Sequence, residues 1–112
     1  MSIQEYQDSV DKWIKEYGVR YFDEKTNMLL LTEEVGELSR LIARKYGEQS
    51  FKKSEDADNV DLNIGEEISD IFFVLTCLSN QMGIDITESI NKNFQKKTNR
   101  DSQRHKSNEK LT

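Results

Sequence analysis

Residues 67–82, EISDIFFVLTCLSNQM, contain the longest apolar run of the chain, the five residues from 71 to 75. From residue 68 onward the apolar residues cover most sides of a helix, and they do not alternate with polar residues as in a half-buried strand. A helix of this kind lies at the centre of a bundle and has more apolar surface than one neighbouring helix covers. We therefore expect a central helix over residues 64–82 that also contacts a second subunit.

Three further segments, residues 3–17, 25–46 and 86–99, have apolar residues at helical spacing. The chain has no proline and only five glycines, which also favours helices. The predicted helix starts are a candidate N-cap at Asp23 and three pairs at capping-box spacing: Ser2 with Glu5, Asn63 with Glu66, and Asp85 with Glu88. The sequence predicts an all-α fold, a helical bundle with four helices per chain that is completed by oligomerisation to a homodimer or homotetramer.

Two polar stretches flank these helices. Residues 48–63 are polar and acidic, and we expect them to form a loop between the second and third helices. Residues 101–112 are charged and almost without apolar side chains, so we expect a flexible tail. The predicted domain therefore spans residues 1–100.

The composition limits the partners that this chain can bind. The 21 acidic and 16 basic residues give a net charge of −5, which disfavours general binding to nucleic acid. No apolar run approaches the ~20 residues that span a bilayer, and the N-terminus lacks the pattern of a signal peptide. The single cysteine, Cys77, lies in an apolar stretch and is expected to be buried. We expect a cytoplasmic protein that binds neither nucleic acid nor a membrane.

Acidic residues occur on the apolar faces of the two central helices. At about 100° per residue, Glu34 and Glu37 fall beside the apolar residues of the second helix. In the third helix, Glu67 falls in the middle of the apolar face and Asp70 lies one step to the side. No lysine or arginine occurs among these positions. Each helix therefore directs a pair of acids at i, i+3 spacing toward its partner.

Buried carboxylates without partners cost several kcal/mol each. Protonation, basic partners or bound cations can offset this cost, and a set of oxygen ligands favours Mg²⁺ or Mn²⁺. The alternative interpretation is that these acids lie in first helical turns and face solvent. It suits Glu66 and, less well, Glu33, but it suits Glu37 and Asp70 poorly because they are flanked by core positions. The only histidine, His105, lies in the tail, so a di-iron carboxylate bundle, a zinc hydrolase and a Ser-His-Asp site are all disfavoured.

Basic residues occupy successive turns near the end of the last helix. Lys97 and Arg100 fall close to its apolar stripe, whereas Lys96 faces toward solvent. They could form a solvated helix end in which cations favour the C-terminal dipole. Beside a metal-carboxylate site they could instead bind phosphate oxygens.

Two acidic motifs resemble the signature of the MazG-like nucleotide pyrophosphohydrolases, a family of the all-α NTP pyrophosphatases. The first is Glu33-Glu34-Val35-Gly36-Glu37, which is similar to E-E-x-x-E. The second, Glu67-Ile68-Ser69-Asp70, is similar to E-x-x-D. The resemblance covers most of the chain, from Tyr6 to about Arg100. For the nucleotide that it implies as substrate, five aromatic residues could stack on the base, although packing is the commoner role: Trp13, Tyr17, Tyr21, Tyr46 and Phe51.

The resemblance implies an enzyme that cleaves nucleoside triphosphates, NTP or dNTP, between the α and β phosphates, as in house-cleaning of the nucleotide pool. It implies Glu34, Glu37, Glu67 and Asp70 as Mg²⁺ ligands, with Mn²⁺ as a substitute and two or more ions beside the substrate. It also implies Glu33 as the acid that orients or deprotonates water. Lys96, Lys97 and Arg100 would bind phosphate, although Asn93 and Lys97 depart from the family pattern K-x-x-K-N-x-x-R. The alternatives are a non-catalytic helical interaction domain or, within the enzyme class, a dUTP- or dCTP-preferring or a phosphoribosyl-ATP pyrophosphohydrolase.

Overall fold

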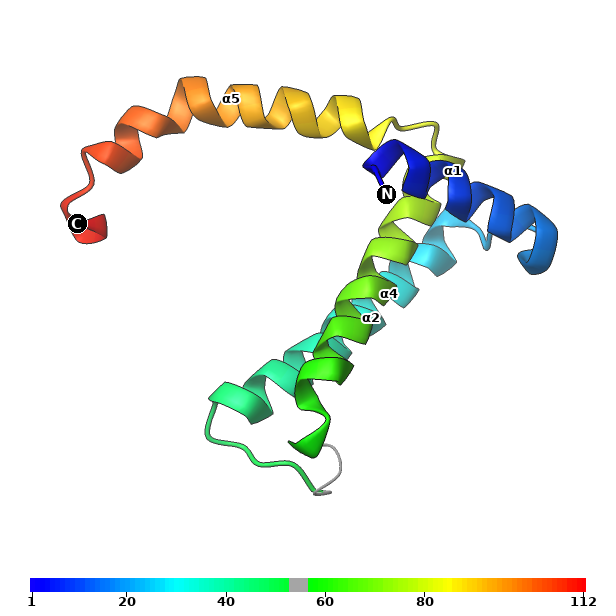
Figure 1. Ribbon diagram of the computed structural model, residues 1–112, viewed down its shortest axis with the longest axis horizontal. Coiled ribbons are helices and arrows are strands. Elements are labelled where there is room, and N and C mark those ends of the chain that lie inside the picture. Colours follow the sequence, from blue (N-terminus) through cyan, green and yellow to red (C-terminus); the bar gives the residue numbers. More distant parts are fainter. Residues whose placement is uncertain (53–56) are drawn as a thin grey trace.

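The computed structural model describes residues 1–52 and 57–112, and every regular element within them is helical. The order of elements is α1 (Ile3–Trp13), the π-helix η1 (Ile14–Gly18), α2 (Glu24–Tyr46), α4 (Val60–Gln81), α5 (Ile86–Lys106) and the 3₁₀-helix η2 (Glu109–Leu111). The all-α prediction with four main helices is confirmed. Helices α2 and α4 lie side by side and α1 crosses one end of the pair (Figure 1).

The helix starts follow from local side-chain caps. Ser2 Oγ accepts a hydrogen bond from Glu5 N while the Glu5 carboxylate accepts one from Ser2 N, which completes the predicted capping box. Asp23 accepts from the backbone of Thr26 at 2.8 Å and Asp85 from that of Glu88 at 3.1 Å. Three of the four predicted starts are therefore confirmed.

Several predicted boundaries were wrong. The third helix begins at Val60 rather than at residue 64, because Val60 and Ile64 both bury part of their side chains one turn apart. The last helix continues past residue 99 to Lys106. Three basic residues in its last turn interact favourably with the negative C-terminal end of the helix dipole, which stabilises this extension. Residues 53–56 of the predicted loop lie outside the described residues.

The first helix also differs from its predicted form. It changes after Trp13 into the π-helix η1, which ends at Gly18. The next residue, Val19, has a φ of 70°. A branched side chain is strained in that region of the backbone map. Nothing in the spacing of apolar residues indicates either feature.

The buried core is small for a chain of 112 residues. Among residues 1–52 and 57–112 it consists of five buried apolar side chains, Val10, Ile14, Leu41, Cys77 and Leu78. The burial of Cys77 is confirmed, and that burial raises the pKa of its thiol to about 11. Large apolar side chains remain exposed on α4 and α5, including Phe72 at 60% and Phe94 at 68%. No helix in the two described ranges is both long and apolar enough to cross a membrane.

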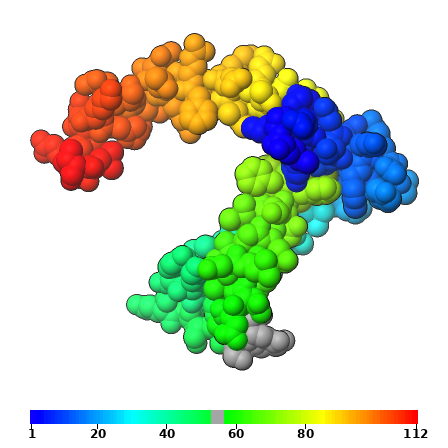
Figure 2. All heavy atoms as spheres, in the orientation of Figure 1, coloured from blue at the N-terminus to red at the C-terminus, as the bar shows by residue number. Residues whose placement is uncertain are grey.

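A buried glutamine fixes the start of α5. Gln7 Nε2 donates to Asn80 Oδ1 and to the carbonyl of Ile84, and Gln7 Oε1 accepts from Ile86 N, all at 3.0 Å. These bonds join α1 to the turn between α4 and α5. From this turn α5 runs away from α2 and α4, so that its second half stands clear of the rest of the chain (Figures 1 and 2).

Candidate metal centre

Helices α2 and α4 bring three carboxylates together. Glu34 lies between the half-buried Leu30 and Leu38 on the face of α2 that packs against α4. Glu67 and Asp70 lie on the facing side of α4. One carboxylate oxygen from each acid lies within 4.8 Å of the others.

The charge of this acid cluster, Glu34, Glu67 and Asp70, is poorly compensated. Glu67 Oε2 is buried and lacks a hydrogen-bond partner among the described residues. Two carboxylates can share a hydrogen bond only when one is protonated, so the close Glu34 carboxyl, with burial, raises the pKa of Glu67 to about 7. Asp70 and Glu37 raise it further. Asp70 is an exposed residue. The partial desolvation of its carboxyl, followed by the charge of Glu34, also raises the pKa of Asp70.

These features suit a hard divalent cation. An uncompensated buried carboxylate oxygen is costly, and a bound cation removes that cost. Oxygen ligands from two helices match the preference of Mg²⁺, which takes one or two carboxylates and completes its shell with water or substrate phosphates. The acid cluster can therefore hold such an ion.

The other two acids of the first motif lie outside the acid cluster. Glu37 is exposed, and its Oε2 lies 3.5 Å from Arg40 Nε. No lysine or arginine stands among the positions of the four acids, but Arg40 reaches back across one helical turn to contact Glu37. Glu33 is exposed beside Glu34. The structure thus brings together three of the four residues predicted as metal ligands.

The basic residues of α5 do not join the acid cluster within one chain. Lys96 and Lys97 are exposed on the part of α5 that leaves the bundle (Figure 1). Arg100 Nε and Nη2 donate to the two carboxylate oxygens of Asp101 at 2.9 and 3.0 Å. Arg104 adds a second contact to Asp101 at 3.5 Å, and these arginines explain why Asp101 is buried on an isolated helix.

A cavity of about 420 Å³ adjoins the acid cluster. Its lining includes the carboxylates Glu34 and Asp70 and, in addition, Trp13, Tyr21, Phe22, Asn27 and Phe73. Trp13 and Tyr21 were among the aromatic residues suggested by the sequence. Phe22, Phe73 and Asn27 were missed, because no local pattern shows which side chains border a cavity between three helices.

Solved structures and a curated sequence resemble this chain. A Bacillus-conserved MazG protein, a nucleotide pyrophosphohydrolase, has a TM-score of 0.73 at 31% identity, covering 92% of this chain and 96% of that chain. The crystal structure of YpjD from Bacillus subtilis has a TM-score of 0.75 at 35% identity, covering 90% and 97%. The sequence of the uncharacterized protein YpjD from Bacillus subtilis strain 168 is 37% identical over 103 residues, 92% of this chain and 89% of YpjD.

The helical fold and the facing acids on α2 and α4 define an all-α protein with a carboxylate site suited to a metal ion. Residues 22–105 match the MazG nucleotide pyrophosphohydrolase domain, and that range contains both acidic motifs. The chain belongs to the MazG nucleotide pyrophosphohydrolase family. The resemblance seen in the sequence is thereby confirmed.

Proposed function

We propose that this protein hydrolyses nucleoside triphosphates between the α and β phosphates and releases a nucleoside monophosphate and pyrophosphate. The observation that carries the proposal is the acid cluster, in which three carboxylates meet around a buried oxygen without a partner. A triphosphate adds about four negative charges to that site, so substrate and cluster are compatible only with divalent cations between them. We expect this activity in the cytoplasm, where it would remove unwanted nucleotides from the nucleotide pool.

The acids of the two motifs have separate roles in this proposal. Glu34, Glu67 and Asp70 hold Mg²⁺, for which Mn²⁺ can substitute, and Glu37 becomes a further ligand when it releases Arg40. When bound, the metal supplies charge neutralisation at the phosphates and an acidified water. The exposed Glu33 carboxylate accepts the proton of the water whose oxygen attacks the α phosphorus. The bond from that phosphorus to the bridging oxygen then breaks, and pyrophosphate leaves.

The position of α5 supports a homodimer or homotetramer. Lys96, Lys97 and Arg100 are the proposed phosphate ligands, yet α5 carries them away from the acids of their own chain (Figure 1). In an oligomer these cations would bind the phosphates of a nucleotide held at the acid cluster of a second copy. A charge-assisted contact to a phosphate oxygen would replace the contact between Arg100 and Asp101.

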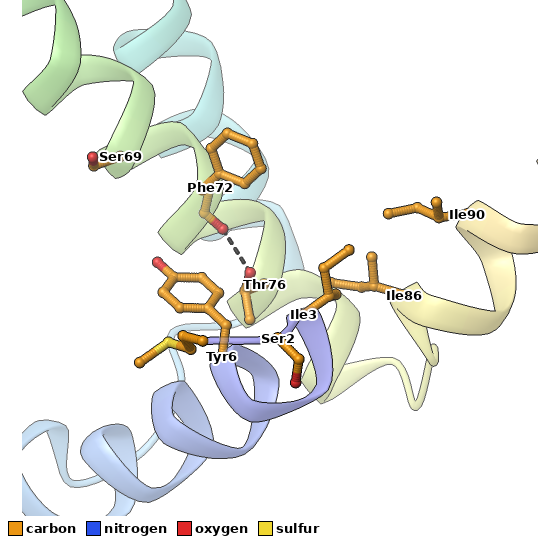
Figure 3. Close-up of a pocket in the computed structure, with 9 residues that line it drawn as sticks. Ser2, Ile3, Tyr6, Ser69, Phe72, Thr76, Ile86 and Ile90 are labelled. Carbon is orange, nitrogen blue, oxygen red and sulfur yellow. Dashed lines mark hydrogen bonds between the residues drawn. The ribbon is translucent and has the colours of Figure 1, made fainter.

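A second cavity suggests where that copy packs. It measures about 380 Å³ and lies between α1, α4 and the start of α5, with mostly apolar walls that include Ile3, Tyr6, Phe72, Ile86 and Ile90 (Figure 3). Phe72 lies about 140° around α4 from Glu67, on the other side from the acid cluster. Burial of these side chains against a second copy would extend the small core, as the apolar helix α4 leads us to expect.

The direct test is product analysis with a mixture of nucleoside triphosphates and Mg²⁺. We expect equal amounts of monophosphate and pyrophosphate, separated by anion-exchange chromatography, and none from the Glu67→Gln variant. The matched control is Glu66→Gln, which changes the exposed neighbour outside the acid cluster and is expected to retain activity. Release of diphosphate and inorganic phosphate, or equal activity in Glu67→Gln, would overturn the proposal.

A further inference from the structure

The cavity beside the acid cluster has walls of two kinds. Glu34 and Asp70 contribute carboxylates to its lining, and Trp13, Tyr21, Phe22 and Phe73 contribute aromatic rings. Its volume of about 420 Å³ lies within the range of small-molecule sites. A nucleotide has the same two parts, because its phosphates pair with metal-bound carboxylates while its flat base stacks on aromatic rings.

On the basis of the function proposed above, we propose that this cavity binds the nucleobase of the substrate and that Asn27 selects cytosine or adenine, the bases with an amino group at position 4 of a pyrimidine or position 6 of a purine. The base stacks on Trp13 and Phe22, and its amino group donates to Asn27 Oδ1. The triphosphate extends from the cavity toward the acid cluster.

The aromatic wall has uncovered surface that a base would bury. Phe22 is 58% exposed and Trp13 is 49% exposed, and both line the partly open cavity. Trp13 meets Phe73 edge to face, with ring centroids 5.7 Å apart at an interplanar angle of 88°. In that arrangement one of the two rings directs its edge, and not its face, at the other, so stacking surface remains for a ligand.

The hydrogen bonds around Asn27 determine which of its atoms is available. Its side chain is almost fully buried, and Nδ2 donates to the carbonyl of Phe22 at 3.3 Å and to Gln81 Oε1 at 2.7 Å. Gln81 Nε2 donates to the same carbonyl at 2.9 Å, which fixes the orientation of the Gln81 amide. Both hydrogens of Asn27 Nδ2 are therefore used, and Oδ1 remains as an acceptor.

An acceptor at that position distinguishes bases by their hydrogen-bonding edges. Cytosine and adenine carry an amino donor where uracil, thymine and guanine carry a carbonyl oxygen. A carbonyl directed at Asn27 Oδ1 would place two acceptors together without a proton between them. Such an unpaired buried group lowers affinity, so uracil, thymine and guanine bind less tightly in the position that cytosine and adenine occupy. To donate a ring N–H to Asn27 instead, these three bases would have to leave that position.

The backbone beside this wall is strained. The π-helix η1 and Val19, with its φ of 70°, directly precede Tyr21 and Phe22 in the chain. The Val19 side chain is 88% exposed, so its own packing does not offset the strain. Both π-helices and strained residues occur preferentially at functional sites, which agrees with a ligand in this cavity.

The only tryptophan of the chain, Trp13, provides a direct test by its fluorescence. The full chain with Mg²⁺ is titrated with CMP, AMP, UMP and GMP, with free N-acetyl-tryptophanamide as the optical control. We expect CMP and AMP to quench Trp13 and to bind roughly 5- to 10-fold more tightly than UMP and GMP, the value of one buried hydrogen bond.

Two variants separate stacking from base selection. Phe22→Ala should weaken binding of all four nucleotides by roughly 5-fold or more and preserve their order. Asn27→Leu, similar in volume, should remove the preference for CMP and AMP. Tyr46→Ala, which removes an exposed ring at the far end of α2, is the matched control and should change neither.

The possible failures of the two proposals differ. Quenching by monophosphates without hydrolysis of any triphosphate would overturn the proposed reaction and retain the base site. Hydrolysis of triphosphates with no quenching by any monophosphate, or with unchanged affinity in Phe22→Ala, would overturn the base site alone. Tighter or equal binding of UMP and GMP would overturn the role of Asn27, even if Asn27→Leu does not fold.

Discussion

Two of the inward-facing polar side chains of helix α4, Glu67 and Asn80, have different surroundings. Asn80 Nδ2 donates to the carbonyl of Gln7 and to Tyr21 Oη, and its Oδ1 accepts from Gln7 Nε2, so both ends of the amide have partners. Glu67 has a buried oxygen without a partner in the described part of the chain, and the acids Glu34 and Asp70 surround it.

The difference distinguishes a structural polar group from one suited to a ligand. A satisfied network fixes how helices pack, and Asn80 with Gln7 joins α1 to the end of α4. A carboxylate without a partner lowers stability unless something binds to it. On this account Asn80 serves the fold and Glu67 serves the metal site.

The largest expected effect is that of Glu67→Gln on activity. Substitution of a group that only hydrogen-bonds to a metal ligand lowers metal affinity or activity roughly 10- to 100-fold. Loss of a ligand itself should therefore lower kcat/KM by more than ~100-fold. In metal-free buffer the same variant should be at least as stable as the wild type, because it removes a buried like charge. Pyrophosphate release and thermal denaturation with EDTA measure the two quantities.

Gln7→Ala is the control variant, because it disrupts the hydrogen-bond network of Asn80 and leaves the acid cluster unchanged. It removes three hydrogen bonds and should lower the free energy of unfolding by about 2–4 kcal/mol while Mg²⁺ binding persists. Equal loss of Mg²⁺ binding in both variants would show that the two polar groups do not have separate roles.

A smaller effect on activity is expected from Arg100→Ala. Loss of one charge-assisted phosphate contact is worth ~1.5–3 kcal/mol, or roughly a 10- to 150-fold fall in kcat/KM. The affinity for Mg²⁺ without nucleotide should not change. The matched control is Arg104→Ala, since Arg104 also contacts Asp101 from the next turn. Similar kinetics in both variants would show that Arg100 belongs to a solvated helix end.

The stability of the metal-free protein should depend on pH through Glu67. Its pKa is raised from an ordinary value of 4.5 to about 7, so between these values the folded state holds a proton that the unfolded state has released. Stability from this group is present below 4.5 and is lost as the pH rises through 7. Relative to Glu67→Gln, the wild type should lose stability between about pH 4.5 and pH 7 in EDTA, measured by urea unfolding. Parallel curves for the two proteins would contradict the raised pKa.

The smallest expected effect is that of truncation after Asp101. The deletion removes the last turn of α5, the exposed η2 and the contact between Arg104 and Asp101. Exposed ion pairs contribute ~0–1 kcal/mol, so kcat/KM and the melting temperature should stay close to the wild-type values. An inactive truncated protein would make the end of the chain part of the site.

Side-chain periodicity predicted the helices and the facing acids, because both depend on spacing along one helix. The angles of Glu34, Glu67 and Asp70 placed them toward the partner helix, and the structure brings their oxygens within 4.8 Å. Their role as metal ligands stays a prediction. The contact of Arg40 with Glu37 was missed because the side-chain length of arginine was ignored.

Tertiary features could not be derived from spacing. The cavity at Phe22 and Asn27 arises where η1, α2 and α4 meet, and no single helix shows it. The departure of α5 from the bundle depends on the bonds of Gln7, which joins segments far apart in the sequence. Homo-oligomerisation stays a prediction supported by the exposed apolar side chains of α4 and α5.

The most direct test of the central claim is the melting temperature as a function of Mg²⁺ concentration in the wild type, Glu67→Gln and Gln7→Ala. A ligand at ten times its Kd stabilises the folded state by about 1.4 kcal/mol, which corresponds to a rise of roughly 5 °C for a domain of this size. The account predicts that rise in the wild type and in Gln7→Ala, and none in Glu67→Gln. No rise in the wild type, or an equal rise in Glu67→Gln, would contradict it.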